Sequence, residues 1–288
     1  MKNRLGPKRG LGTSPLYIDF EKFWKEGMLD WHGKMPERMV DDELEEAFWA
    51  QSMKKKTYRQ TDDYAKKIYE KIKLYIPQDA SCIEIGPGSG NYTFQLSEDI
   101  KNLTLVDGSE SVLAYLKQYY ESDAPVQFVY SKWEEAQIEP HDVVVGVNCF
   151  YRMYEMKAAL KKMDALARKR AIIGLTTGPI QPHYVILDEQ YGYEIKYPRR
   201  DYIMILNILY QLGIYADCEM IKLERTYRYD TLEQLYATQS KKILSSTFEQ
   251  AHVEASLEPF ITLEERQYVY RHPFYAAIIS WEPSNSHD

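Results

Sequence analysis

Residues 82–93, with the sequence CIEIGPGSGNYT, decide the fold that this chain can adopt. A short apolar run that carries one acid, Glu84, leads into three glycines at alternate positions, Gly86, Gly88 and Gly90. A strand that passes through closely spaced glycines into a helix brings bare backbone amides close to a ligand at the carboxyl edge of an open α/β sheet. The segment therefore predicts a ligand-binding turn between the first strand of such a sheet and the next helix.

The spacing of the glycines and the acid before them restrict the kind of ligand. The G-x-G-x-x-G pattern of dinucleotide-binding turns would need a glycine where this chain has Asn91, and the third glycine is instead Gly90. Glu84 would repel a pyrophosphate at this turn and favours a ligand that carries an amine. Asp107 ends the next predicted strand, where a carboxylate can accept hydrogen bonds from both hydroxyls of a ribose. The pattern therefore predicts a ligand with a ribose and a cationic group.

The composition argues against several other classes of protein. The chain has 288 residues, 44% of them hydrophobic, and its formal net charge of −7 makes nucleic acid an unexpected partner, because nucleic-acid-binding domains usually carry a basic excess. The three cysteines show no metal-ligand spacing and no signal peptide is evident, so we expect a cytoplasmic protein without a structural metal. The most apolar run, residues 202–214, is too short to span a bilayer, so we expect a buried helix there and no membrane partner.

The pattern along the chain predicts an α/β fold with a helical cap. Residues 1–60 are expected to form a flexible basic arm and then helices, because aromatic and apolar residues recur at helical spacing in 20–31 and 41–53. From residue 61 onward, alternating strand and helix patterns indicate a parallel, doubly wound sheet. The predicted strands are 81–86, 102–107, 126–131, 141–150, 170–177, 218–229 and 275–281. One predicted helix begins at Asp62 and ends before Pro77, because Ala65, Ile68 and Ile72 recur at helical spacing. The other predicted helices are 91–100, 109–120, 157–169, 202–213 and a stretch from 231 to about 250, and residues 178–200 are predicted to be a polar loop.

The motif E-x-G-x-G-x-G, followed by a strand that ends in Asp107, resembles the class I S-adenosylmethionine-dependent methyltransferases. The resemblance extends over residues 64–281. It implies a seven-stranded Rossmann-like sheet with helices on both faces and an antiparallel last strand. A helical N-terminal cap and a helical insertion before the last strand accompany that sheet here. On this interpretation residues 61–288 form the methyltransferase domain, and S-adenosylmethionine is the cofactor.

The resemblance also implies roles for individual residues. Glu84 and the glycine turn would line the methionine side of the cofactor, Gly90 would let the following helix pack closely, and Asp107 would hold the ribose. Tyr58 would be the aromatic residue that closes over the cofactor. The implied cofactor-binding residues are Glu84, Gly86, Pro87, Gly88, Asp107, Gly108, Ser109, Lys132, Trp133, Asn148 and Tyr58.

The turn after the third predicted strand departs from the family pattern. Lys132 stands where the family often has an acid beside the adenine. Trp133 is expected to stack on the adenine, and Glu134 is a substitute acceptor for the exocyclic amine.

The end of the fourth predicted strand supplies candidates for the acceptor side. The resemblance places Asn148 and Cys149 under the methionine and directs the next three residues, starting with Phe150, toward the methyl acceptor. Cys149 is expected to be a small packed residue, because no activating base is evident. The acceptor-side candidates are Tyr151, Arg152 and, as a possible base in the loop after the fifth strand, His183.

Two long segments after the fifth and sixth strands, residues 178–200 and 231–266, are expected to form a lid together with the N-terminal helices. A closed lid favours a small-molecule acceptor over a protein tail or nucleic acid. The sequence thus predicts an enzyme that transfers a methyl group to a small molecule by in-line displacement. Two alternatives remain: a catalytically silent sensor or scaffold that binds the cofactor, and a nicotinamide or flavin enzyme, against which Gly90 and Glu84 argue.

Overall fold

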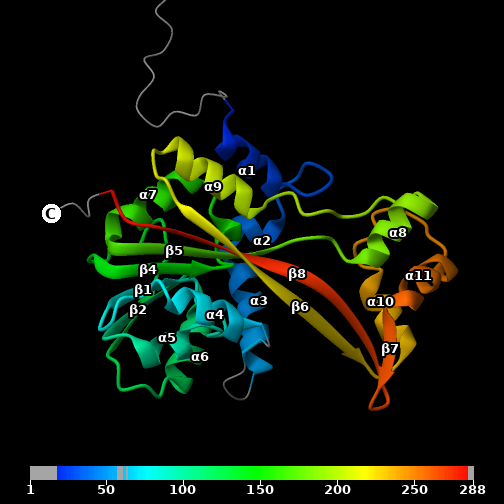
Figure 1. Cartoon of the computed structure of the whole chain (residues 1–288), viewed down its shortest axis with the longest axis horizontal. Helices are drawn as coiled ribbons and strands as arrows, with labels where there is room; N and C mark the ends of the chain where they lie inside the picture. Colours follow the sequence, from blue (N-terminus) through cyan, green and yellow to red (C-terminus); the bar gives the residue numbers. More distant parts are fainter. Residues whose placement is uncertain (1–17, 57–60, 63, 285–288) are drawn as a thin grey trace, which may run out of the picture. The chain divides into compact units, whose positions relative to one another are not determined.

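The computed structural model describes residues 18–56, 61–62 and 64–284 (Figure 1). The chain forms two compact units. The first unit comprises the residues up to Leu175, Arg200–Glu219 and the residues from Ala277 onward, and the second comprises Thr176–Arg199 and Met220–Ala276. The region predicted as one domain from residue 61 onward thus contributes to both units.

Parallel strands form the centre of the first unit. β1 pairs with β2 and β4, β2 pairs with β3, and β4 pairs with β5, all in parallel. In this register Ile85, the last residue of β1, lies beside Val106 of β2 and Gly146 of β4, so the carboxyl ends of the three strands are level. The glycine turn, Asp107 and the end of β4 therefore come together at one edge. The bounds are β1 Ser81–Ile85, β2 Asn102–Asp107, β3 Val126–Tyr130, β4 His141–Val147 and β5 Ala167–Thr177.

Seven strands of the sheet follow the order β3-β2-β1-β4-β5-β8-β6, which confirms the predicted Rossmann-like fold class, with β6 Asp217–Tyr229 and β8 Gln267–Trp281. One strand was not predicted: β7, Ile261–Glu264, pairs with β8 in an antiparallel hairpin. Its two turn residues, Glu265 and Arg266, both have positive φ angles, of 49° and 68°. Such turns usually contain asparagine or glycine, so this sequence carried no hairpin signal.

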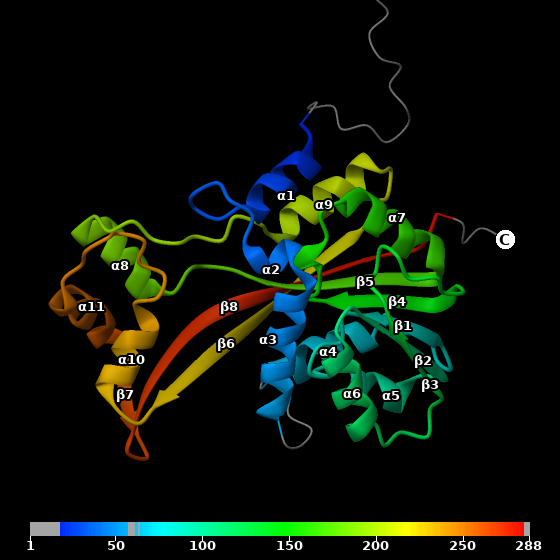
Figure 2. The same ribbon diagram turned by 180° about the vertical axis from the view of Figure 1, so that it is seen from behind.

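Helices cover both faces of the sheet in the first unit (Figures 1 and 2). α4, α5 and α6 lie on one face, and α7 and α9 lie on the other. α9 is the predicted apolar helix, and it buries Ile205, Ile208 and Leu209. In the described part of the chain, no helix is long and apolar enough to cross a membrane. The bounds are α4 Ala65–Lys73, α5 Thr93–Asp99, α6 Glu110–Tyr119, α7 Met156–Leu166 and α9 Tyr202–Gln211.

Between residues 18 and 56, three helices form the predicted N-terminal cap. Asp19 and Asp41 begin α1 and α3 by accepting hydrogen bonds from free backbone N–H groups of the first turn. α1 is anchored by Trp24, which is buried and donates a hydrogen bond of 2.8 Å to the carbonyl of Met153. α3 packs on α6. The bounds are α1 Phe20–Met28, α2 Glu37–Val40 and α3 Asp42–Lys54.

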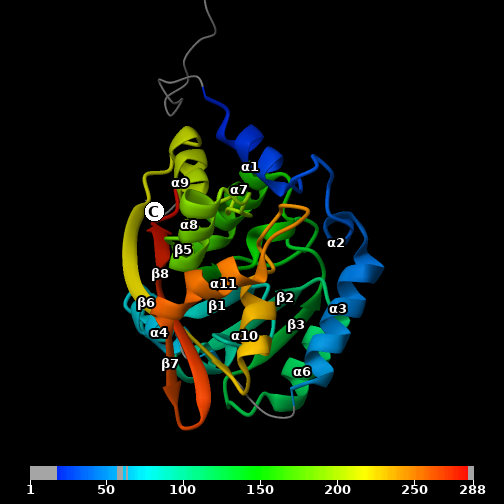
Figure 3. The same cartoon turned by 90° about the vertical axis from the view of Figure 1, so that its right-hand side faces the viewer.

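The second unit has its own core, to which α8, α10, α11 and β8 contribute (Figure 3). The prediction of a polar loop over residues 178–200 was wrong, because α8 begins with Pro182 in its first turn and ends at Gly192 in the left-handed conformation. The prolines and glycines around this helix obscured its apolar positions. The helical stretch predicted from residue 231 is two helices, separated by residues 240–249. The bounds are α8 Pro182–Tyr191, α10 Leu232–Gln239, α11 Gln250–Leu257 and η2, a 3-10 helix, Glu258–Phe260.

Candidate functional site

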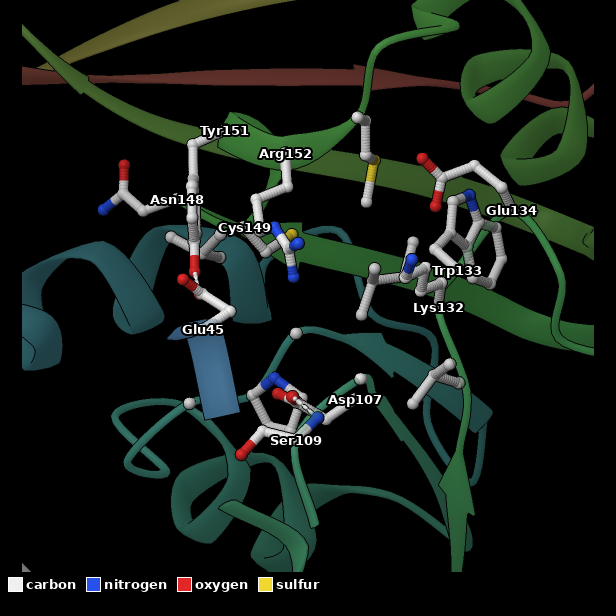
Figure 4. A pocket seen from close by; sticks show the side chains of 18 of the residues that line it. Glu45, Asp107, Ser109, Lys132, Trp133, Glu134, Asn148, Cys149, Tyr151 and Arg152 are labelled. Atoms are coloured by element: carbon white, nitrogen blue, oxygen red, sulfur yellow. Dashed lines mark hydrogen bonds between the residues drawn. The ribbon is translucent and has the colours of Figure 1, made fainter. Parts of the chain in front are cut away.

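A cavity of about 760 Å³ opens in the first unit at the carboxyl ends of β1, β2 and β4 (Figure 4). The glycine turn, Asp107, and the ends of β3 and β4 line it. A short 3-10 helix, η1 (Phe150–Arg152), and the cap helix α3 complete the wall. Of the predicted site residues, the cavity brings together Gly86, Pro87, Gly88, Asp107, Gly108, Ser109, Lys132, Trp133, Asn148, Tyr151 and Arg152. Glu134 and Cys149 also line it.

The glycine turn needs glycine because of its backbone conformation and because neighbouring side chains pack closely against it. Gly86 and Gly88 have φ angles of 57° and 53°, which L side chains rarely adopt. A Cβ atom at Gly86 would come within 2.5 Å of the Cβ of Cys149 on the neighbouring strand end. At Gly90 a Cβ atom would come within 2.6 Å of Phe94 on α5, so this glycine permits close packing of the helix, as the resemblance implied.

Asp107 projects from the end of β2 into the cavity. Its Oδ1 accepts a hydrogen bond of 2.9 Å from the backbone N–H of Ser109. Burial raises the pKa of Asp107 to about 6, and the negative charges of Glu46 and Glu45 act in the same direction. The carboxylate is therefore mostly ionised at neutral pH, where it can accept hydrogen bonds from ribose hydroxyls.

Glu84 lies on β1, outside the lining of the cavity, and is buried with 4% of its surface exposed. The hydroxyl of Thr93 donates a hydrogen bond of 2.7 Å to its Oε2. Burial raises the pKa of Glu84 to about 8, although the Thr93 hydrogen bond opposes this shift, and the charge of Asp107 adds to it. Its implied role on the methionine side of the cofactor stays a prediction.

We expect the raised pKa of Glu84 to appear in the pH dependence of stability. An acid whose pKa rises from 4.5 in the unfolded chain to about 8 in the folded protein stabilises the fold below the lower value. That contribution is lost as the pH rises toward 8, because the unfolded chain releases the proton first. Glu84→Gln keeps the shape of the side chain but has no proton to release in this range. Between about pH 5.5 and about pH 8.5, the free energy of unfolding of the wild type should therefore fall by roughly 3 kcal/mol more than that of Glu84→Gln.

Denaturant unfolding at the two pH values measures this difference. Glu110→Gln is the matched control, because it makes the same replacement of an acid by its amide at an exposed position at the start of α6. An identical pH dependence in the wild type and Glu84→Gln would show that Glu84 is not held protonated in the folded protein.

Acids on α3 tie this helix to both sides of the cavity. Asp42 bridges Lys132, at 2.6 Å, and Arg152, at 2.7 Å. Glu45 accepts hydrogen bonds from Trp49 and from the hydroxyl of Tyr151. These contacts were not predicted, because acids in the first turn of a helix are also expected from the helix dipole alone. Their spacing along α3, which places them on one helix face with Trp49, was the signal that could have found them.

Asn148, Cys149 and Phe150 follow β4 and differ in their exposure. Asn148 is exposed and has a positive φ of 54°, and its backbone N–H donates to the carbonyl of Gly174 at 2.8 Å. Burial, with the charges of Asp107 and Glu84, raises the pKa of the Cys149 thiol well above its usual value, which opposes a role as a nucleophile. Phe150 was expected to face the acceptor, but it is 1% exposed and packs in the core of the first unit.

Lys132 and Trp133, which follow β3, are each held by a helix: Trp133 by α7 and Lys132 by α3. Trp133 is buried, and its indole N–H donates a hydrogen bond of 3.1 Å to the carbonyl of Ala159 on α7. Lys132 points to Asp42 on α3. Both residues still contribute to the cavity wall, as does Glu134, so their predicted places beside the adenine stay predictions.

His183 lies in the second unit and is not part of the cavity lining. It is fully buried on α8, with the hydroxyl of Tyr270 at 2.8 Å from Nδ1 and the carbonyl of Gln239 at 3.0 Å from Nε2. Burial lowers the pKa of His183 to about 4. With both ring nitrogens engaged, this histidine serves the packing of the second unit, and the expectation of a loop residue there was wrong. Tyr58, the predicted aromatic closure, lies outside the described residues, as does the basic arm.

Comparison with known proteins agrees with this geometry. Residues 82–170 match the family model described as a methyltransferase domain. A candidate methyltransferase from Bacillus halodurans C-125 is similar in structure with a TM-score of 0.52 and 14% identity, over 77% of this chain and 98% of that one. A candidate methyltransferase from Haloferax volcanii, in complex with the methyltransferase activator Trm112, has a TM-score of 0.54 and 13% identity over 86% and 100% of the two chains. No curated protein matches the sequence.

The chain therefore contains a class I S-adenosylmethionine-dependent methyltransferase domain. It is an enzyme of the methyltransferase class, and its methyl donor is S-adenosylmethionine. The site fits this cofactor, because a cradle of bare backbone at Gly86 and Gly88 lies level with the carboxylate of Asp107, which is suited to a ribose. A nicotinamide or flavin enzyme is thereby set aside.

Proposed function

We propose that this enzyme methylates a small molecule that binds beside the cofactor in the cavity under α3. The observation that carries the proposal is the pair of ion pairs from Asp42 to Lys132 and Arg152, which joins the start of α3 to two residues of the cavity wall. The cavity volume of about 760 Å³ lies within the range of roughly 300–1,000 Å³ that is usual for small-molecule sites. A protein tail or a nucleic acid would need an open groove instead.

Within this proposal, each wall of the cavity has a task. The glycine turn takes the methionine part of the cofactor, Asp107 takes the ribose, and Trp133 and its neighbours take the adenine. The end of β4 and η1, with Tyr151 and Arg152, face the acceptor. This assignment is supported by the lining of the cavity, in which the three groups come from separate strand ends.

The cofactor, when bound, supplies a sulfonium methyl group with a good leaving group. The protein then has to hold the acceptor in line and exclude water, and such positioning can lower a barrier by roughly 7–11 kcal/mol. We expect α3 to exclude water, because Glu45 and Trp49 of this helix line the cavity. The segments 178–200 and 231–266 stay a predicted lid. A cytoplasmic location is part of the proposal and is supported by the three free cysteines.

Calorimetric titration with S-adenosylhomocysteine, S-adenosylmethionine and NAD tests the proposal. We expect micromolar dissociation constants for the first two ligands and no heat of binding with NAD. Binding of NAD alone would contradict it. Tight binding of S-adenosylhomocysteine without formation of that product from any small-molecule acceptor would favour the sensor alternative.

A further inference from the structure

The apolar helix α9 is buried on one side only. Residues 202–214 contain no acidic or basic side chain, and a helix that is apolar all round is usually enclosed by its protein. The side of α9 that packs in the core of the first unit is buried, whereas Ile203 is 47% exposed and Tyr210 is 43% exposed. The outward side of α9 is therefore an apolar surface that no other described part of the chain covers.

The helix α1 and the residues after α9 extend this surface. The two helices pack on each other (Figures 1 and 2), and the side chain of Gln211 on α9 donates a hydrogen bond to the carbonyl of Ile18, just before α1. Phe23 on α1 is 48% exposed. The exposed Tyr215, which follows α9, contacts Tyr210 edge to face, with ring centroids 5.8 Å apart. We call these four exposed residues the α1–α9 face: Phe23, Ile203, Tyr210 and Tyr215.

The charges beside the α1–α9 face cancel. Lys22 and Glu26 form an exposed i,i+4 ion pair at 3.7 Å, and their spacing places both on the same side of α1 as Phe23. The whole chain has a formal net charge of −7, so two copies repel each other unless they meet through a neutral surface. A neutral, aromatic surface is typical of the core of a protein–protein interface. An anionic membrane would instead attract an excess of basic residues, which this face lacks.

We propose that the α1–α9 face is the interface between two copies of this chain. In a dimer with two-fold symmetry the same surface of each copy meets itself, so α1 of one copy lies antiparallel to α1 of the other. Lys22 of each copy then faces Glu26 of the second copy, and the ion pair within one helix becomes two ion pairs between helices. The contact removes Ile203 and Tyr210 from water, which supplies its apolar stabilisation.

Sedimentation velocity on the full chain tests the proposal. We expect a dimer at low micromolar concentration, and Ile203→Asp should raise its dissociation constant about a hundredfold or more. An acid in the first turn of α9 is compatible with the helix, so this variant should fold and should bind S-adenosylhomocysteine with the affinity of the wild type. Leu263→Asp is the matched control, because it places the same charge at an apolar residue of β7 that is 67% exposed. This control should leave the dimer intact.

The ion pair on α1 provides a test that is specific for self-association. Lys22→Glu and Glu26→Lys should each raise the dissociation constant of the dimer about tenfold, because like charges then face each other across the interface. An equimolar mixture of the two variants should form a heterodimer with the affinity of the wild type. In that heterodimer, each contact between position 22 of one copy and position 26 of the other again joins opposite charges.

Thermal unfolding of each variant shows that it is folded before its association is compared. A wild type that stays monomeric up to about 100 μM would overturn the inference, and so would a dimer that Ile203→Asp leaves intact. A mixture of Lys22→Glu and Glu26→Lys that associates no more tightly than either variant alone would overturn the two-fold pairing. Failure of the wild type to bind S-adenosylhomocysteine would contradict the proposed function and would leave the result on the dimer unaffected.

Discussion

Gly86→Ala is expected to weaken the binding of S-adenosylhomocysteine about a hundredfold or more. Two costs coincide at this position. The φ angle of 57° disfavours any L side chain, at roughly 1–2 kcal/mol. The new Cβ atom would also meet the Cβ of Cys149 at 2.5 Å, and Cys149 is the residue directly before η1. The turn must shift to relieve this contact, and the backbone amides that approach the cofactor shift with it.

Gly33→Ala is the matched control for this experiment. Gly33 has a φ angle of 74°, and a Cβ atom there would meet nothing within 4 Å, so the substitution tests the left-handed conformation without the clash. Titration calorimetry on both variants should show normal affinity for Gly33→Ala. The double variant Gly86→Ala with Cys149→Gly should recover part of the lost affinity, because it removes the Cβ atom of Cys149 with which the new Cβ atom would clash. Equal affinity in Gly86→Ala and the wild type would mean that the turn does not hold the cofactor.

Asp107→Ala is expected to weaken S-adenosylhomocysteine binding about tenfold or more, which corresponds to about 1.4 kcal/mol. Asp107 is the acid at the end of β2, and its carboxylate is oriented by the N–H of Ser109 at 2.9 Å. On the proposed assignment, loss of the carboxylate would leave the ribose hydroxyls without their acceptor. Asp107→Asn should show a similar loss at neutral pH, because an amide offers one acceptor oxygen and no charge.

The pKa of Asp107 adds a pH test. Because this pKa is about 6, the carboxylate takes up a proton as the pH falls below that value, and the wild type should then lose affinity. The advantage of the wild type over Asp107→Asn should therefore shrink between about pH 7.5 and about pH 5. Glu110→Gln, which removes an exposed charge close by on α6, should behave like the wild type. An affinity unchanged in Asp107→Ala would exclude this residue from the ribose site.

Much of the fold, and the position of the glycine turn beside Asp107, could be predicted from the sequence, because their signals are local. The glycine turn requires specific residues at consecutive positions, since backbone conformation and close approach are decided within the turn itself. The register of β1 and β2 then places Asp107 beside that turn without further information. The burial of Ala65, Ile68 and Ile72 on α4 likewise follows from their helical spacing.

The acceptor side and the second unit depended on contacts between residues far apart in the sequence. Glu45 and Tyr151 are 106 positions apart, and no local pattern pairs a helix acid with a tyrosine after β4. His183 had no visible partner in the sequence, whereas in the fold it contacts Tyr270 from 87 positions away. The β7–β8 hairpin was hidden because Glu265 and Arg266 adopt a conformation that neither residue prefers on its own.

The sequence by itself determined the nature of the cofactor turn and the order of strands and helices, because the glycines, the acid of Asp107 and the apolar periods act over a few residues. Only the tertiary structure decided which side chains complete the cavity. Tyr151 is oriented by its hydrogen bond to Glu45, and Arg152 by its ion pair with Asp42. Both acids lie on α3, which precedes the sheet in the chain. Hydrogen bonds and ion pairs between distant segments depend on the packing of whole elements, and that packing is set by the complete fold.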